Sequence, residues 1–230
     1  MREIVLDTET TGLDPSDGHR VIEIGCVELE DHIPTGRSFQ RYLNPQRTVP
    51  IESQRVHGIT DEFLADKPGF SAVANDLLTF LGDAPLVIHN ASFDIKFLNA
   101  EFARVSFPAI PLARAIDTME IAKAKHPGGR YSLDDLCKKF GVDLSGRGKH
   151  GALLDAELTA RVYLELVGGR QTKLKLGPRD LGADVEAVIV ELRARIREIP
   201  LRTRISAAES EAHTAFITAE LGSDPVWNWQ

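Results

Sequence analysis

The chain has 230 residues, of which 43% are hydrophobic, and its 27 Lys and Arg stand against 34 Asp and Glu, for a net charge of -7. This length suits one full-sized domain with an appendage, or two small domains. The composition excludes a long disordered chain, and the acidic balance argues against a protein that coats DNA with a basic surface. No apolar run approaches the roughly 18 residues needed to cross a bilayer, and no signal peptide is recognisable, so a cytoplasmic protein without membrane contact is expected.

Residues 1–169 alternate short apolar runs with amphipathic stretches, which predicts an α/β domain with a mixed sheet and helices packed on it. Short turns rich in Gly, Asp and Pro join the first apolar runs, and connections this short indicate antiparallel pairing. The expected strands are 4–6, 21–29, 38–43, 86–88 and 113–116. The expected helices are 70–81, 92–105, 133–140 and 152–167.

The composition shifts after the last of these helices. Residues 170–206 hold nine Lys and Arg against five Asp and Glu, whereas 207–230 hold four acids and no Lys or Arg. Apolar residues within 185–199 fall at helical spacing, and Ser206 with Glu209 forms a capping-box pattern that opens a second helix. So short a segment cannot bury two apolar stripes well on its own, so it is expected to bury them on something else.

Acidic residues follow two of the expected strands. Asp7 and Glu9 end the first strand, and a spacing of two places both carboxylates on one face. Asp94 follows strand 86–88 at the start of a helix. His150 precedes a helix that carries Asp155, and five residues separate the two, so both can face one cleft if the loop folds over it. Taken singly, solvated edge-strand or first-turn positions also explain such acids.

Four converging carboxylates would repel one another, and some would protonate. Hard divalent cations remove that problem, and oxygen ligands without cysteine favour Mg²⁺ or Mn²⁺ over zinc. Two such ions about 3.5 to 4 Å apart can bind one phosphate, activate a water and stabilise the departing oxygen, which is the chemistry of phosphodiester hydrolysis. A histidine that titrates near neutrality is suited to take the proton from that water.

Three segments, DTETTG at 7–12, HNASFD at 89–94 and HGALLDA at 150–156, resemble in order and spacing the three motifs of the DEDDh 3′→5′ exonucleases. Segment 56–64, VHGITDEFL, makes the chain most similar to the proofreading subunits of bacterial DNA polymerase III. The resemblance implies a ribonuclease H-like exonuclease fold and a metal-dependent enzyme that releases nucleoside 5′-monophosphates from mispaired DNA 3′ ends. It assigns two Mg²⁺ or Mn²⁺ ions to Asp7, Glu9, Asp94 and Asp155, and the general base to His150.

The same resemblance implies contacts with the single-stranded or frayed DNA 3′ end. Glu52 and His57 match positions that contact the terminal nucleotide in the family, although a surface turn would explain His57 equally well. Thr10, Gly12 and Phe93 are expected beside that nucleotide. The implied substrate-binding set is Asp7, Glu9, Thr10, Gly12, Glu52, His57, Phe93 and Asp155.

The tail resembles a connector. Segment QTKLKL at 171–176 is similar to sliding-clamp-binding sequences, with Gln171, Leu174 and Leu176 as anchors, although an ordinary linker can contain such a pattern by chance. The end of the chain resembles a segment that binds the catalytic (alpha) subunit of the polymerase. Aromatic residues are enriched at binding hot spots, but they can also fold back on the exonuclease domain. The expected polymerase anchors are Phe216, Trp227 and Trp229.

The expected organisation is an exonuclease domain over 1–169, a linker with the clamp motif over 170–184 and a polymerase-binding segment over 185–230. Binding of a small accessory subunit stays open. Two other functions fit the same sequence: a free-standing nuclease that acts on RNA ends or repair intermediates, and a tether between polymerase and clamp with only residual catalysis. Comparing the degradation of matched DNA and RNA oligonucleotides distinguishes the free-standing nuclease. Deletion of the tail tests the role as a tether.

Overall fold

The computed structural model describes residues 1–145, 148–168 and 206–221. The chain divides into two compact units, Met1–Leu174 and Lys175–Gln230. The strands are β1 (Arg2–Thr10), β2 (Val21–Glu30), β3 (Ile33–Tyr42), β4 (Leu86–Ile88) and β5 (Ala115–Asp117). The helices are α1 (Ile51–His57), α2 (Asp61–Leu64), α3 (Phe70–Leu81), α4 (Ala91–Arg104), α5 (Thr118–Lys125), α6 (Leu133–Phe140), α7 (Ala152–Val167) and α9 (Ala207–Leu221), with the 3-10 turns η1 (Pro15–Asp17) and η2 (Leu112–Arg114).

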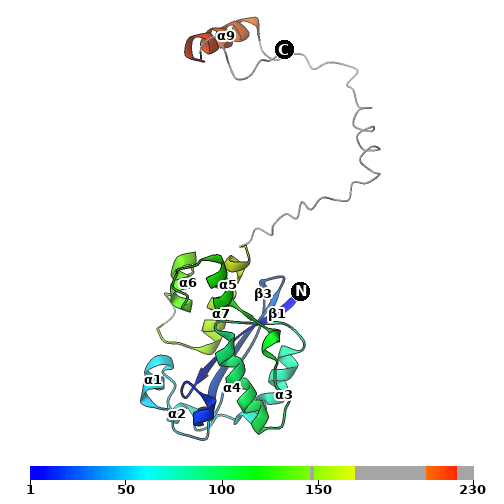
Figure 1. Cartoon of the computed structure of the whole chain (residues 1–230), viewed down its shortest axis with the longest axis vertical. Helices are drawn as coiled ribbons and strands as arrows, with labels where there is room; N and C mark the ends of the chain where they lie inside the picture. The colour runs from blue at the N-terminus through cyan, green and yellow to red at the C-terminus, as the bar shows by residue number, and fades with distance from the viewer. Residues whose placement is uncertain (146–147, 169–205, 222–230) are drawn as a thin grey trace, which may run out of the picture. The chain divides into compact units, whose positions relative to one another are not determined.

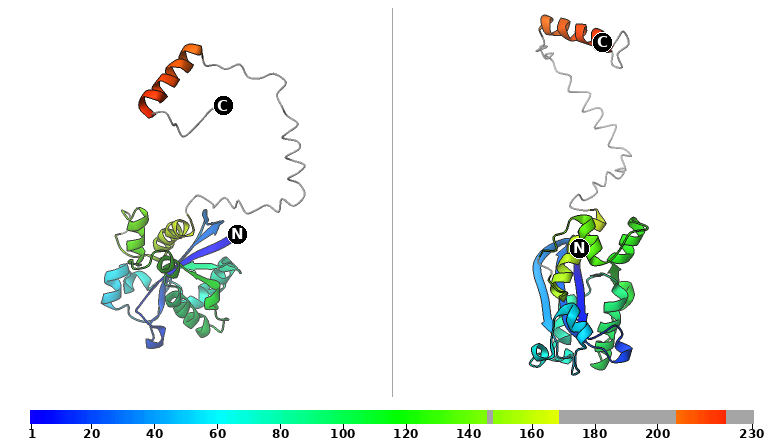
Figure 2. Two further views of the ribbon diagram at one scale, coloured as in Figure 1. Left: turned by 45° about the horizontal axis from the view of Figure 1, so that its top comes forward. Right: turned by 90° about the vertical axis from the view of Figure 1, so that its left-hand side faces the viewer.

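The five strands form one mixed sheet in the order β3-β2-β1-β4-β5. The pairs β1–β2 and β2–β3 are antiparallel, whereas β1–β4 and β4–β5 are parallel. The two views of Figure 2 show the N-terminal strands, in blue, running together. Because β1, β4 and β5 are parallel, their carboxyl ends lie along the same edge of the sheet. The mixed α/β architecture predicted from the sequence is confirmed.

The alternation of side chains along β1 divides the core into two layers. Ile4 and Leu6 face the layer that contains α3 and α4, and they pack in the largest buried cluster. Val5 faces the opposite side, where it packs with Ala156 and Tyr163 of α7. Figure 1 shows α5, α6 and α7 grouped together, apart from α3 and α4. The sheet is therefore covered on both faces, and α7 lies against its central strands.

The structure differs from the predicted elements where hydrophobic patterning is weak. Strand β3 begins at Ile33, five residues before its expected start, because its exposed first half shows no apolar alternation. Residues 113 and 114, expected to begin the last strand, belong to η2 instead, and β5 begins at Ala115. Helices α1, α2 and α5 were not predicted, since none has more than eight residues or a long apolar stripe.

The expected helix after Ser206 is confirmed as α9. The Ser206 hydroxyl accepts a hydrogen bond from Glu209 N at 3.3 Å, and Glu209 Oε2 accepts one from Ser206 N at 2.8 Å, which completes the capping box. The expected helix over 185–199 lies outside the described residues, as do the anchors Gln171, Leu174, Leu176, Trp227 and Trp229. Among the helices described, none is both long and apolar enough for a membrane span.

A glycine on β2 marks the place where α7 begins. Gly25 pairs with Asp7 in the strand register. A Cβ atom on Gly25 would lie 2.2 Å from both Ala152 C and Leu153 N, far inside van der Waals contact. The first turn of α7 therefore rests directly on the backbone of β2, and only glycine allows this approach.

We expect the substitution Gly25→Ala to lower the free energy of unfolding by about 1–3 kcal/mol, because the added methyl group must displace the backbone of α7. Urea denaturation of both proteins measures the difference. Gly148→Ala is the matched control, since a Cβ atom there meets no atom within 4 Å in the described structure. Equal stability of the two variants would show that α7 does not depend on this close approach.

Candidate active site

The carboxyl end of β1 supplies two carboxylates to one face of the sheet. Asp7 is half-buried and Glu9 is buried, and both side chains lie on the face that α7 covers. Thr8 lies between them and points to the opposite face. There its hydroxyl donates a buried hydrogen bond to Asp94 Oδ1 at 2.7 Å. Strand β1 thus presents two acids and fixes a third.

Asp94 enters the site from the first turn of α4, directly after β4. The chain turns from strand to helix at Asn90, whose φ of 67° lies in the left-handed region that asparagine adopts more readily than most residues. The Asp94 side chain is only 3% exposed. This tight turn brings Asp94, which lies six residues after the end of β4, back to the edge of the sheet where β1 ends.

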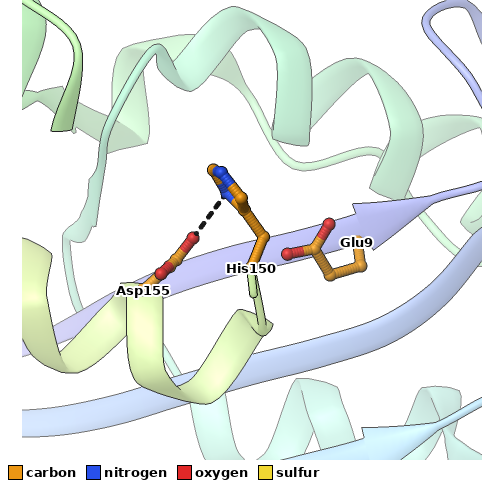
Figure 3. Close-up of side chains that lie close together, drawn as sticks. All are labelled: Glu9, His150 and Asp155. Carbon is orange, nitrogen blue, oxygen red and sulfur yellow. Dashed lines mark hydrogen bonds and ion pairs between the residues drawn. The ribbon is translucent and has the colours of Figure 1, made fainter. Parts of the chain in front are cut away.

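His150 and Asp155 reach the same place from the start of α7. His150 Nδ1 lies 3.1 Å from Asp155 Oδ2, and the ligand atoms of Glu9, His150 and Asp155 lie within 4.8 Å of one another. Figure 3 shows these three side chains gathered from β1, from the loop before α7 and from α7 itself. The loop therefore folds toward the helix, as the five-residue spacing of His150 and Asp155 requires.

The cluster is electrostatically strained. Burial raises the pKa of Asp7 well above its usual range, and the nearby charges of Asp94, Glu9, Asp155 and Glu23 raise it further. Burial also raises the pKa of Asp94 to about 7, although the Thr8 hydroxyl opposes the shift. Asp94 is therefore close to half-protonated at neutral pH without a cation. Such a site gains free energy from any positive charge placed among its carboxylates.

The donor set fits divalent cations. Three carboxylates, those of Glu9, Asp94 and Asp155, lie close enough to Asp7 to raise its pKa. Carboxylate oxygens are the ligands preferred by hard cations such as Mg²⁺ and Mn²⁺. The raised pKa values of Asp7 and Asp94 are the expected signature of acids held together for a cation rather than for ion pairs with Lys or Arg.

Asp117 organises the edge of the sheet, although the sequence did not reveal it. It ends β5, and its carboxylate accepts hydrogen bonds from Asn90 N at 3.2 Å and Ala91 N at 2.9 Å, at the start of α4. It also accepts from Met119 N at 2.8 Å and so caps α5. One carboxylate therefore holds the turn that delivers Asp94. The sequence signal for Asp117 is its place as the last residue of a strand parallel to β4.

Helix α1, which carries Glu52 and His57, is joined by hydrogen bonds to the turn after β1 and to His150. Ser53 Oγ donates to Thr11 O at 3.1 Å, and Val56 O accepts from His150 N at 3.3 Å, so the helix links the turn after β1 to the loop before α7. His57 is buried, and Glu52 is exposed in the first turn of the helix. A Cβ atom on Gly58 would meet the Lys149 side chain at 2.5 Å, which ties the end of α1 to the His150 loop.

His57 has a polar atom without a partner. Its Nδ1 accepts from Ile59 N at 3.0 Å, and its buried Nε2 has no hydrogen-bond partner within the described parts of the chain. Burial, and then the charges of Lys149 and His150, lower the pKa of His57 to about 4. The ring is therefore neutral near pH 7 and carries its proton on Nε2. A buried N–H without a partner is suited to donate to a ligand.

The three remaining predicted substrate residues lie close to the acids along the chain. The Thr10 hydroxyl donates to Gly12 O at 2.6 Å and shapes the turn after β1. A Cβ atom on Gly12 would lie 2.3 Å from the His19 ring, so a larger residue there would displace that side chain. Phe93 precedes Asp94 and packs on Phe97 with ring centroids 4.9 Å apart. All three lie within three residues of Glu9 or Asp94 along the chain, and their contact with a nucleotide stays a prediction.

The fold and the acidic site define an exonuclease. Residues 4–163 match the family described as Exonuclease, and the chain belongs to this family. Among solved structures, Exonuclease X in complex with 5′ overhanging duplex DNA is 27% identical, with a TM-score of 0.56 over 71% of this chain and 90% of that chain. The nuclease domain of 3′hExo, a DEDDh family member bound to rAMP, shares the fold at 24% identity, with a TM-score of 0.63 over 72% of this chain and 91% of that chain.

The similarity to curated proteins is more specific. The DNA polymerase III subunit epsilon of Rickettsia conorii is 54% identical over 179 residues, which cover 76% of this chain and 78% of the relative. The protein of the same name from Escherichia coli is 46% identical over 177 residues, or 74% of this chain and 72% of the relative. Within the exonucleases, the chain therefore belongs with the epsilon subunits of DNA polymerase III.

We expect Asp94→Asn to stabilise the cation-free protein near pH 8 by up to about 4 kcal/mol and to change its stability little near pH 4. The folded-state pKa of Asp94 is raised to about 7. In the unfolded chain this carboxyl ionises at its ordinary pKa of about 4. The folded wild-type protein therefore loses stability as the pH rises from about 4 to about 7. The asparagine still accepts from Thr8 but cannot ionise, so the variant avoids this loss.

Thermal denaturation in the presence of EDTA, across this range of pH, measures the effect. Asp76→Asn on the exposed face of α3 is the control, because it removes an acid remote from the cluster. Parallel stability curves for wild type and Asp94→Asn would contradict the assignment of a buried, proton-holding carboxylate to this position.

Proposed function

We propose that the protein is the 3′→5′ proofreading exonuclease subunit of a DNA polymerase III core. It hydrolyses the terminal phosphodiester of mispaired DNA 3′ ends and releases nucleoside 5′-monophosphates. The observation that carries the proposal is the convergence of Asp7, Glu9, Asp94 and Asp155, with His150 beside them, in a chain 54% identical to an epsilon subunit. Its place of action would be the replisome at the nucleoid, in the cytoplasm.

The four carboxylates would hold two divalent cations, Mg²⁺ or Mn²⁺. Bound there, the cations would neutralise the acidic cluster and polarise the scissile phosphate. The protein's own contribution is to fix the acids on β1, α4 and α7, so that the donors are in place before the substrate arrives. Burial of Asp94 and Glu9 keeps water away from the donors and strengthens their attraction for cations.

His150 would take the proton from the attacking water. A neutral imidazole accepts a proton near physiological pH, whereas carboxylates engaged with cations are poor bases. The contact of His150 Nδ1 with Asp155 Oδ2 holds the ring at the cluster. The side chain is 48% exposed, so the ring can meet substrate and return its proton to solvent.

The terminal nucleotide would lie between the acids and helix α1. The buried Nε2–H of His57 is the proposed donor to an oxygen of that nucleotide. Glu52 lies five residues earlier, in the first turn of α1, and would contact the same nucleotide. Thr10, Gly12 and Phe93 would line the remaining sides.

The C-terminal part would connect the nuclease to the replisome. Phe216 of α9 is 61% exposed in the described part of this unit, a high value for a large aromatic side chain, and it would anchor on the polymerase catalytic (alpha) subunit together with Trp227 and Trp229. Gln171, Leu174 and Leu176 would bind the sliding clamp. The corresponding organisation is a nuclease over 1–169, a clamp-binding linker over 170–184 and a polymerase-binding segment over 185–230, with room for a small accessory subunit.

We expect the double variant Asp7→Asn with Glu9→Gln to lose at least about 100-fold in kcat on single-stranded DNA in Mg²⁺ or Mn²⁺, because it removes charge but not volume from the site. Release of nucleoside 5′-monophosphate is the measurement, with Asp76→Asn as the control. Retained activity would refute the site. Faster digestion of a matched RNA oligonucleotide than of DNA would favour a free-standing RNA-trimming enzyme instead.

We expect the full chain to co-purify with the alpha subunit, whereas a chain ending at residue 169 does not. Phe216→Ala should weaken the complex by about 10-fold or more, as typical for a hot-spot residue. Surface plasmon resonance gives the affinities, and excision of a 3′ mismatch during synthesis gives the functional consequence. Equal binding by the full and shortened chains would remove the connector role but leave the nuclease assignment intact.

A further inference from the structure

A fifth acid lies beside the cluster. Glu23 of β2 is only 1% exposed, and it is the register partner of Glu9 on the neighbouring strand. Directly opposed residues on antiparallel strands share a face of the sheet. Glu23 therefore lies on the α7 side with Asp7 and Glu9, and its charge is among those that raise the pKa of Asp7.

The two oxygens of Glu23 have different partners. Oε1 accepts from Gln40 Nε2 at 2.8 Å, and Gln40 Nε2 also lies 3.2 Å from Tyr42 OH on the outer strand β3. Oε2 accepts from Ala152 N at 3.1 Å in a buried hydrogen bond that joins residues 129 positions apart. One oxygen thus belongs to the sheet and the other to the beginning of α7.

Ala152 is the first residue of α7, and its N–H is one of the four that a helix leaves without an internal partner. The preceding N-cap residue is Gly151, which has no side chain to satisfy these groups. Glu23 supplies the missing acceptor from a different strand. Its negative charge also lies at the positive end of a 16-residue helix, where it is stabilised by the helix dipole.

The position of this helix terminus determines the geometry of the site. His150 lies two residues before Ala152, and Asp155 lies one turn after the start of the helix. The contact at Gly25 fixes how closely α7 approaches β2, but a van der Waals contact does not prevent the helix from sliding or rotating on the strand. The hydrogen bond from Ala152 N to Glu23 is directional and limits those movements.

We propose that Glu23 is a positioning residue for the nuclease: through Ala152 N it fixes the first turn of α7, and thereby Asp155 and His150, against Asp7 and Glu9. The role rests on the proposed active site. A displacement of catalytic groups by about 1 Å can cost about 100-fold in rate, so a hydrogen bond that restrains the helix terminus has a large effect on catalysis.

Three substitutions separate the hydrogen bond from the charge. Glu23→Gln loses the charge but keeps an oxygen that can accept from Ala152 N. The NH₂ group of the new glutamine can donate to the Gln40 carbonyl oxygen once the Gln40 amide has rotated by half a turn. Glu23→Asp keeps the charge but is one methylene too short to reach α7. Glu23→Ala loses both. Glu28→Ala is the matched control, because Glu28 is another buried acid of β2, but it bonds Arg2 and Arg37 rather than α7.

We expect Glu23→Ala and Glu23→Asp to lower kcat by about 10–100-fold with KM for a DNA oligonucleotide within about 3-fold, whereas Glu23→Gln stays within about 3-fold of wild type in kcat. Glu28→Ala should lower thermal stability but not kcat. Calorimetric titration with Mn²⁺ should show weaker binding in the Ala and Asp variants by a similar factor. If Glu23→Ala does not fold, the difference in kcat between Glu23→Asp and Glu23→Gln tests the proposal.

A readout without metal or substrate tests the hydrogen bond itself. Amide hydrogen exchange at Ala152, followed by NMR in EDTA, should be at least about 10-fold faster in Glu23→Ala and Glu23→Asp than in wild type and Glu23→Gln. Full activity in all three variants would overturn the proposal, as would an active Asp variant beside an inactive Gln variant. Activity of the Asp7→Asn, Glu9→Gln protein would instead refute the underlying active site, so the two failures are distinguishable.

Discussion

The mutual repulsion of carboxylates in a poorly hydrated site is the constraint on which this structure depends. Burial, with a smaller contribution from the charge of Asp117, raises the pKa of Asp94 to about 7, and burial together with acidic neighbours raises the pKa of Asp7. Left to itself, such a cluster would open the fold or take up protons. The surrounding structure must therefore hold the acids together until cations compensate them, and much of the domain's local architecture serves this requirement.

The restraint comes from backbone N–H groups rather than from basic side chains. Asp117 accepts from the N–H groups of Asn90 and Ala91, which fixes the turn before Asp94. Glu23 accepts from Ala152 N, at the start of the helix that carries Asp155. Both restraining groups are themselves acids, so they hold their helices without supplying a Lys or Arg that would neutralise the site. An ammonium or guanidinium in the same places would compete with a cation for the carboxylates.

The sequence predicted the acidic residues of the site better than the residues that hold these acids in position. Asp7 and Glu9 follow a strongly apolar strand, and helix 70–81 was predicted to the residue because its apolar positions repeat at helical spacing. Glu23 and Asp117 carried no such signal, because their partners lie 129 and 26 or 27 residues away and depend on how strands pair. Helix α1 likewise has no clear signal in the sequence. It is seven residues long, with tertiary contacts at Thr11 and His150.

The net charge of -7 has to be interpreted together with the positions of the acidic residues in the structure. Charge spread evenly over the surface would repel DNA, but four of these acids lie in one site and two more restrain its helices. With two divalent cations bound, as proposed, the substrate phosphate would approach positive charge held in a low-dielectric setting, where attraction is stronger than at a solvated lysine. A basic surface binds DNA along its length, whereas such a site attracts one phosphate. Recognition of a strand end requires only the latter, so an acidic protein can be a DNA exonuclease when its acids are concentrated at the proposed position of the scissile phosphate.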